Sequence, residues 1–351
     1  MASIDQRLKQ LEELNKHHSQ VFCSTDAQMQ RKLYRAQHQT KIVAFQCMDG
    51  RIHIPFITKT PLGIIKSFRN LGGKFNLGWY YFGAVVEEEV NYALSRGQKI
   101  IVIDSYHFAK GSVHRGCAGC NYRKEDSIRE AATLKVQTER IYGSSGQVVC
   151  PIIVGVETDE DALIFHGDDI SKTLDLSEVK GEDKHALRVL LRKLYRKMPE
   201  DMLEDLLPLA LGNIRHIAEI KKKKRAIVEV EHQEDVLAVG RGFDWLFQPN
   251  KALIVGPYEP DLSVPIKKAA GIILSNMEAG RIPSDGFILL TSAVFRSGAG
   301  VPKALARERA LNLSEAAQKT VRECCGGMHE LMRPLTVVTN LDTRRFELVK
   351  A

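Results

Sequence analysis

The sequence predicts an α/β protein in which a mostly parallel sheet is flanked by helices. Short, continuously apolar runs alternate along the chain with longer segments whose apolar residues recur at helical spacing. The apolar runs show no alternation of polar and apolar residues, which is typical of parallel strands that are covered on both faces. Polar residues with metal-binding chemistry gather where these runs end, as at the strand ends of an α/β sheet.

The first half of the chain supplies most of these elements. Residues 4–38 are polar and helix-favouring, with a loose leucine stripe, and they predict one or two helices that pack on a neighbour. After them the apolar runs predict strands at 41–47, 64–69, 100–104 and 148–156. Helical spacing predicts helices at 79–97 and 124–141.

The second half resembles a weaker repeat of the first. After a long helical connection at 183–225, the pattern predicts strands at 252–255, 286–290 and 335–338 and helices at 264–280 and 302–323. We compare Ala252–Val255 with the first strand, which sets Cys47 against Gly256 or Pro257, and a second comparison sets His107 against Val294.

We therefore infer a degenerate second copy of the α/β domain that lacks zinc ligands. The alternative is that two unrelated halves share the same generic periodicity. The predicted boundaries are an N-terminal helical segment at 1–38, a catalytic zinc domain at 39–180, a helical connection at 181–225 and the second copy at 226–351.

Composition excludes several classes of protein. The chain has 351 residues, 44% of them hydrophobic and 26% charged, as in ordinary soluble proteins. No apolar run is long enough for a membrane helix, and the N-terminus has no signal-peptide core. Seven cysteines without a secretory signal indicate a reducing compartment, so we expect a cytoplasmic protein with no membrane partner.

The net charge is +7, and one basic run stands out at 221–225. Aromatic residues do not interleave with these lysines, as they do on many surfaces that bind single-stranded nucleic acid. We interpret the run as the solvated end of a helix, where cations suit the helix dipole, and we expect no nucleic-acid partner.

Three residues predict a zinc site. Cys47 ends the first predicted strand, His107 follows a later one, and Cys117 lies in a glycine-rich loop that can fold back. Thiolate and imidazole are preferred zinc ligands, and three protein ligands with one open position are typical of a catalytic zinc. His114 stands three residues before Cys117 and stays open as an alternative ligand.

Asp49 and Arg51 follow Cys47 closely and predict acid–base chemistry beside the metal. Asp49 can accept a proton or a hydrogen bond from water, and Arg51 can pair with Asp49 and fix its direction. Alternatively, Asp49 binds the metal itself and closes the site. Gly72 and Gly73 either shape the pocket through their backbone N–H groups or form a tight turn.

Cys117 and Cys120 form a Cys-x-x-Cys motif, so a thiol redox protein is a further hypothesis. The role of Cys120 stays open under the zinc hypothesis. The remaining cysteines are interpreted as small buried apolar residues, namely Cys23, Cys150, Cys324 and Cys325.

These motifs together resemble the β-class carbonic anhydrases. The resemblance lies in Cys47-x-Asp49-x-Arg51, in the run from Arg69 to Gly73, and in a strand-end histidine followed by a cysteine. The sequences around His107 and Cys117 are more similar to the carboxysome shell branch of that class, in which a degenerate second copy replaces a second subunit's active domain. The resemblance covers about residues 40 to 351, densely at 41–167.

The resemblance implies a zinc lyase that interconverts carbon dioxide and bicarbonate through a zinc-bound hydroxide. Cys47, His107 and Cys117 would hold Zn²⁺, while Asp49 would orient the hydroxide and Arg51 would hold Asp49. A catalytically silent zinc-binding scaffold of the same fold is the alternative.

One departure concerns packaging. The shell enzymes carry an additional N-terminal domain, whereas only some 40 residues precede the first motif here. Carboxysome packaging and association with RuBisCO therefore stay open beside a free-standing cytoplasmic protein, as does a homodimer.

Overall fold

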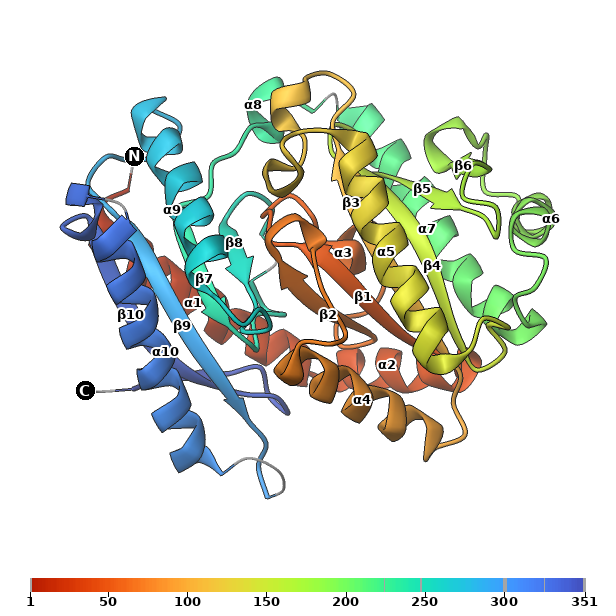
Figure 1. Ribbon diagram of the computed structural model, residues 1–351, viewed down its shortest axis with the longest axis horizontal. Coiled ribbons are helices and arrows are strands. Elements are labelled where there is room, and N and C mark those ends of the chain that lie inside the picture. Colours follow the sequence, from red (N-terminus) through yellow and green to blue (C-terminus); the bar gives the residue numbers. More distant parts are fainter. Residues whose placement is uncertain (1, 224, 247, 299–301, 325, 350–351) are drawn as a thin grey trace. The chain divides into compact units, whose positions relative to one another are not determined.

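The computed structural model describes residues 2–223, 225–246, 248–298, 302–324 and 326–349 (Figure 1). The chain divides into two compact units. The first unit is Gln30–Cys47 with Ile52–Val230, and the second unit is the residues before Gln30, the short segment Met48–Arg51 and the residues from Glu231 onward. A mixed α/β architecture is confirmed in both units.

The first unit contains a six-stranded sheet in the order β2-β1-β3-β4-β5-β6. The first four strands of that order are parallel, β5 pairs antiparallel with β4, and β6 pairs antiparallel with β5. Residues of β1, β3 and β4 are buried nearly throughout, which explains their continuous apolar sequences. The bounds are β1 Lys41–Cys47, β2 Ile65–Asn70, β3 Ile100–Phe108, β4 Val149–Glu157, β5 Ala162–His166 and β6 Thr173–Asp175.

Helices cover this sheet. In Figure 1, α5 (yellow) runs along β3 and β4, on which it packs, and α7 packs on β5. Aromatic rings bind α4 to the sheet, because Phe82 of α4 lies 5.2 Å from Phe45 and 5.9 Å from Phe68 between ring centroids. The helices of this unit are α3 Ile54–Ile57, α4 Tyr80–Leu94, α5 Lys124–Tyr142, α6 Lys184–Leu194, α7 Glu200–Lys223 and α8 Ile227–Val230, and α2 Thr25–Gln37 begins before it.

The second unit contains a five-stranded sheet in the order β11-β10-β9-β7-β8. Only β11 is antiparallel to its neighbour. Ile4 and Leu11 of α1 pack into the same core as Trp245 on one face, and α10 packs on β9 and β10 with Ala306 against Val338 on the other. The bounds are α1 Ile4–Cys23, β7 Val236–Gly240, β8 Ala252–Val255, α9 Ser263–Glu278, β9 Phe287–Phe295, α10 Lys303–Cys324, β10 Met332–Asn340 and β11 Phe346–Leu348.

The two sheets share one topology. The order β8-β7-β9-β10-β11 repeats the order β2-β1-β3-β4-β5 in sequence connection and in strand direction. The strands β3 and β9 each have nine residues, as do β4 and β10. This correspondence supports the predicted duplication, which stays a prediction.

The topology corrects one strand comparison made from sequence. Ala252–Val255 is the edge strand β8 at the position of β2, and the central position of β1 belongs to β7. When the strand registers are continued, Arg241 takes the place of Cys47, and Val294 takes that of His107. Neither Arg241 nor Val294 is a zinc ligand type, so this sheet edge lacks the predicted ligand set.

Two further outcomes concern the helices. The helical connection predicted at 183–225 is broken into α6 and α7 by the non-helical residues 195–199, the last of which is Pro199. Among the described residues, the structure contains no helix with the length and apolar character needed to span a bilayer.

Candidate metal centre

Two of the three predicted ligands lie at one edge of the first sheet. Cys47 is the last residue of β1, and His107 is the penultimate residue of β3. Because β1 and β3 are parallel neighbours, their carboxyl ends meet at the same edge. Cys117, just before the short 3₁₀ turn Ala118–Cys120, completes the cluster. The ligand atoms of Cys47, His107 and Cys117 all lie within 4.8 Å of one another, and all three side chains are buried.

A contact between two glycine-containing turns brings the Cys117 loop to this edge. The turn Leu71–Gly73 packs against the turn Ala118–Cys120. A Cβ on Gly119 would lie 2.5 Å from the Cα of Gly72, so only glycine permits this approach. Gly72 itself has a φ of 69°, a conformation that glycine adopts without strain. These glycines therefore position Cys117.

Gly73, the second predicted pocket residue, is buried with a φ of 65°. A Cβ at this position would lie 2.9 Å from the carbonyl oxygen of Ser105 on β3. The turn after β2 thus lies directly against β3, two residues before His107.

Arg69 supports the exit of β1. Its Nε donates a hydrogen bond to the carbonyl oxygen of Cys47 at 3.1 Å, and a terminal nitrogen donates to the carbonyl oxygen of Ile52. The guanidinium thus joins the backbone on both sides of the turn that follows Cys47. From sequence alone, Arg69 was recognised only as part of a motif, without a role of its own.

The electrostatics of the cluster fit a divalent cation. The neighbouring thiols of Cys120 and Cys47, together with burial, raise the pKa of Cys117 well above its usual value. The Sγ atoms of Cys47 and Cys117 are 3.9 Å apart. Two thiolates and one neutral imidazole balance a doubly charged ion, and bound zinc favours the deprotonated thiols. The donor set therefore fits Zn²⁺.

His114, the alternative ligand, is placed differently. It is exposed in the short turn Val113–Arg115, where its ring lies 6.2 Å from that of Tyr122. The cluster of ligand atoms found among the described residues contains His107 in its place.

Asp49 and Arg51 belong to the second unit and pair with each other. Nε of Arg51 donates to Oδ1 of Asp49 at 2.9 Å, and a terminal nitrogen donates to Oδ2 at 2.6 Å. The backbone N–H of Arg51 also donates to Oδ1 at 2.9 Å. The side chain of Asp49 is 6% exposed and that of Arg51 is 0% exposed, so this bidentate ion pair is shielded from water. Arg51 thereby fixes the direction of the Asp49 carboxylate.

Two further residues adjoin this pair, and sequence reasoning missed both. His232 Nε2 lies 3.0 Å from a terminal nitrogen of Arg51 and 3.7 Å from Oδ2 of Asp49. His232 Nδ1 lies 3.0 Å from Glu234. Burial has the largest single effect and lowers the pKa of His232, but the carboxylates of Glu234 and Asp49 together outweigh burial and Arg51, so the net pKa is raised. The sequence feature that could have identified them is the His-x-Glu spacing of His232 and Glu234, just before the buried strand β7.

The chain matches no protein-family model, and no curated protein matches it. One solved structure that it resembles is the beta-carbonic anhydrase CcaA. The identity is 16% and the TM-score is 0.30, over 44% of this chain and 95% of that one. At this TM-score the likeness carries no weight for function.

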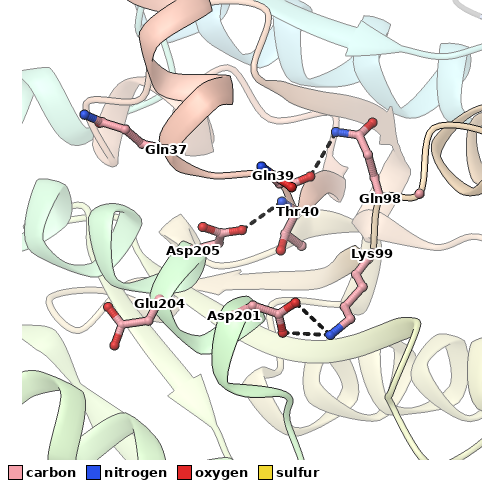
Figure 2. A pocket seen from close by; sticks show the side chains of 9 residues that line it. Gln37, Gln39, Thr40, Gln98, Lys99, Asp201, Glu204 and Asp205 are labelled. Carbon is pink, nitrogen blue, oxygen red and sulfur yellow. Dashed lines mark hydrogen bonds and ion pairs between the residues drawn. The ribbon is translucent and has the colours of Figure 1, made fainter.

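A polar hollow of about 300 Å³ lies at the opposite end of β1 and β3 (Figure 2). Thr40 and Lys99, which come just before these strands, line it, and Lys99 forms an ion pair with Asp201. None of the predicted site residues lines this hollow, so it is separate from the metal cluster.

The cysteines outside the metal cluster other than Cys120 were interpreted as buried apolar residues, and the structure gives a different outcome for different cysteines. Cys150 and Cys120 are buried, but Cys23 is exposed at the end of α1, so the prediction for Cys23 was wrong. The neighbouring Val21 is 44% exposed as well, so the apolar residues at this helix end do not form a buried face. Cys325 and the side chain of Cys324 lie outside the described residues. Cys120 contacts Cys117, and that hydrogen bond lowers the pKa of Cys120 to about 7.

Proposed function

We propose that the protein is a zinc-dependent carbonic anhydrase that interconverts carbon dioxide and bicarbonate. The observation that carries the proposal is the buried convergence of Cys47, His107 and Cys117, whose ligand atoms lie within 4.8 Å of one another. Three such ligands leave one tetrahedral position for water or substrate. The resemblance of the surrounding motifs to β-class carbonic anhydrases supplies the reaction.

The residues of the chain would have distinct roles in this reaction. Cys47, His107 and Cys117 would hold the zinc, which lowers the pKa of water enough to provide a nucleophile near neutral pH. Burial of all three side chains keeps competing solvent away from the ligand atoms. Arg69 and the contact between Gly72 and Gly119 hold the backbone segments that carry the two thiols.

Asp49 accepts a hydrogen bond from the attacking water and orients it. Asp49 is two residues after Cys47, so their Cα atoms are at most about 7 Å apart. Its carboxylate already accepts three hydrogen bonds from Arg51, which favours a carboxylate that keeps its direction over one that turns to bind the metal. This supports an open site over a closed one and an enzyme over a silent scaffold.

Stopped-flow hydration of carbon dioxide, on protein of measured zinc content, tests the proposal. We expect about one zinc per chain and rapid hydration, with hydration lost and zinc retained in Asp49→Ala. One zinc per chain without hydration from neutral to alkaline pH would favour the scaffold. Protein that binds no zinc would overturn the ligand set.

Thiol redox chemistry is a second candidate, favoured by the contact between Cys117 and Cys120. It predicts a requirement for Cys120, which the zinc hypothesis does not.

A further inference from the structure

We propose that His232 and Glu234 are positioning residues that lock the Asp49–Arg51 pair in the geometry that hydration needs. This inference rests on the proposed function. Both residues lie just before β7, and both belong to the same unit as the segment Met48–Arg51. They act through the pair and not on the substrate.

The first step concerns the proton on His232. A guanidinium only donates hydrogen bonds, so Nε2 of His232 must accept the bond from Arg51 at 3.0 Å. The imidazole proton is then on Nδ1, which is 3.0 Å from one oxygen of Glu234 and 3.1 Å from the other. The contacts therefore assign the arrangement in which Nδ1 of His232 donates to Glu234 and Nε2 accepts from Arg51.

The second step concerns Glu234, whose side chain is fully buried. A buried carboxylate needs partners for its charge, and Glu234 has two. It accepts from His232 and also from the backbone N–H of Gly50 at 3.1 Å. Gly50 stands between Asp49 and Arg51, so Glu234 fixes the backbone of the pair while His232 fixes the guanidinium.

Gly50 shows how close this approach is. A Cβ there would lie 2.9 Å from Cγ of Glu234 and 2.8 Å from the carbonyl oxygen of Ala252. Two backbone bonds hold the same segment, from Ile254 N–H to the oxygen of Met48 at 2.8 Å and from Asn250 N–H to that of Gly50 at 3.1 Å. The segment is thus anchored along its length.

A metal site is a competing explanation, because ligand atoms of Asp49, His232 and Glu234 also lie within 4.8 Å of one another. Arg51 argues against it. Its permanent positive charge lies 2.6 Å from Asp49 and 3.0 Å from His232, in the space where a second cation would meet repulsion. The guanidinium takes the place that a metal ion would need.

Kinetics of full-length, zinc-loaded variants test the inference. We expect His232→Ala and Glu234→Gln each to lower kcat roughly tenfold, as for the loss of one orienting hydrogen bond, with KM little changed and zinc retained. His232→Gln, which can still donate and accept, should recover part of kcat. His216→Ala is the matched control, since it removes a similar buried contact, 3.0 Å from Asp161, in the first unit.

Proton NMR adds a measurement that does not depend on turnover. The zinc-loaded wild type should show one slowly exchanging imidazole N–H resonance that disappears in His232→Ala and shifts in Glu234→Gln. If the wild type is active and His232→Ala keeps full kcat, the inference is wrong while the proposed function stands. The absence of that resonance from an active wild type has the same meaning. A zinc-loaded wild type without hydration overturns the proposed function, and the inference with it.

Discussion

The sulfur atoms of Cys47 and Cys117 lie 3.9 Å apart, although 70 residues separate them in the chain. A pair of buried thiols at this distance is suited to sharing one metal ion. Replacing either should therefore affect metal and activity together.

Cys47→Ser should remove both bound zinc and carbon dioxide hydration, because a serine hydroxyl is a far weaker zinc ligand than a thiolate. Zinc content and stopped-flow hydration, measured on one sample, check this. Cys150→Ser is the control, since Cys150 is also buried but lies on β4 outside the cluster. Retention of stoichiometric zinc by Cys47→Ser would refute the ligand assignment.

Gly119→Ala should destabilise the fold and weaken zinc binding, because the new methyl group would meet the backbone of Gly72 at 2.5 Å. Overpacking of this kind costs roughly 1–3 kcal/mol in the free energy of unfolding. Urea denaturation and competition with a zinc chelator measure the two effects.

The control for that prediction is Gly271→Ala on α9, where a Cβ meets nothing within 4 Å. It should be neutral or stabilising by up to about 1 kcal/mol, since alanine favours a helix. If both variants behaved alike, the close approach of the two turns would not matter.

Asp104→Asn should stabilise the protein at neutral pH. Asp104 lies on β3 and is 1% exposed, and neither carboxyl oxygen has a hydrogen-bond partner within the described part of the chain. Burial raises its pKa well above the usual value, an effect that Lys135 reduces and Glu139 increases. An uncompensated buried polar group costs roughly 1–3 kcal/mol, which asparagine should partly relieve because it carries no charge.

The same residue sets a pH dependence. Because the pKa is raised on folding, the native state binds the proton more tightly, and the stabilising contribution is complete below the unfolded value of 3.8. It is lost as pH rises through the folded value. Urea unfolding between pH 4 and 8 should show this loss in the wild type and less of it in Asp104→Asn. Destabilisation of the variant at pH 7 would show that the carboxylate is paired.

Cys120→Ser should keep zinc and most hydration activity, since Cys120 is not one of the three converging ligands. A serine hydroxyl can replace its contacts near Cys117 with little change in volume. Zinc analysis and stopped-flow kinetics of this variant separate the zinc hypothesis from the redox one. Complete loss of function with zinc retained would favour a Cys-x-x-Cys mechanism.

Much of the fold follows from local sequence. The strands 41–47 and 252–255 were predicted with their observed bounds, because each is a short, mostly apolar run that directly follows a polar residue, Thr40 or Lys251. Strand β7 was missed, although its apolar residues Val236–Val239 lie between a charged stretch and Gly240 and form a run as long as that of β8. Because β7 was missed, the first strand β1 was compared with β8 and not with β7.

Some residues of the candidate site could likewise be predicted from sequence, and others could not. Cys47 and His107 could be named from sequence because both follow apolar runs that predict strands. His232 and Glu234 could not, because their contacts with Arg51 and Gly50 join segments about 180 residues apart and depend on tertiary structure. A resemblance to known motifs cannot identify His232 and Glu234, because both lie outside the motifs that were matched.

The separation of Arg51 from His232 by 181 residues has a consequence for a chain emerging from the ribosome. All three candidate metal ligands are synthesised well before the residues that fix Asp49 and Arg51. A nascent or truncated chain that ends before Glu231 can present the thiols and the imidazole, yet it lacks both partners of the pair. Under the proposed function, the metal would therefore be captured before the pair is locked, and full turnover would follow only after the residues from Glu231 onward have folded.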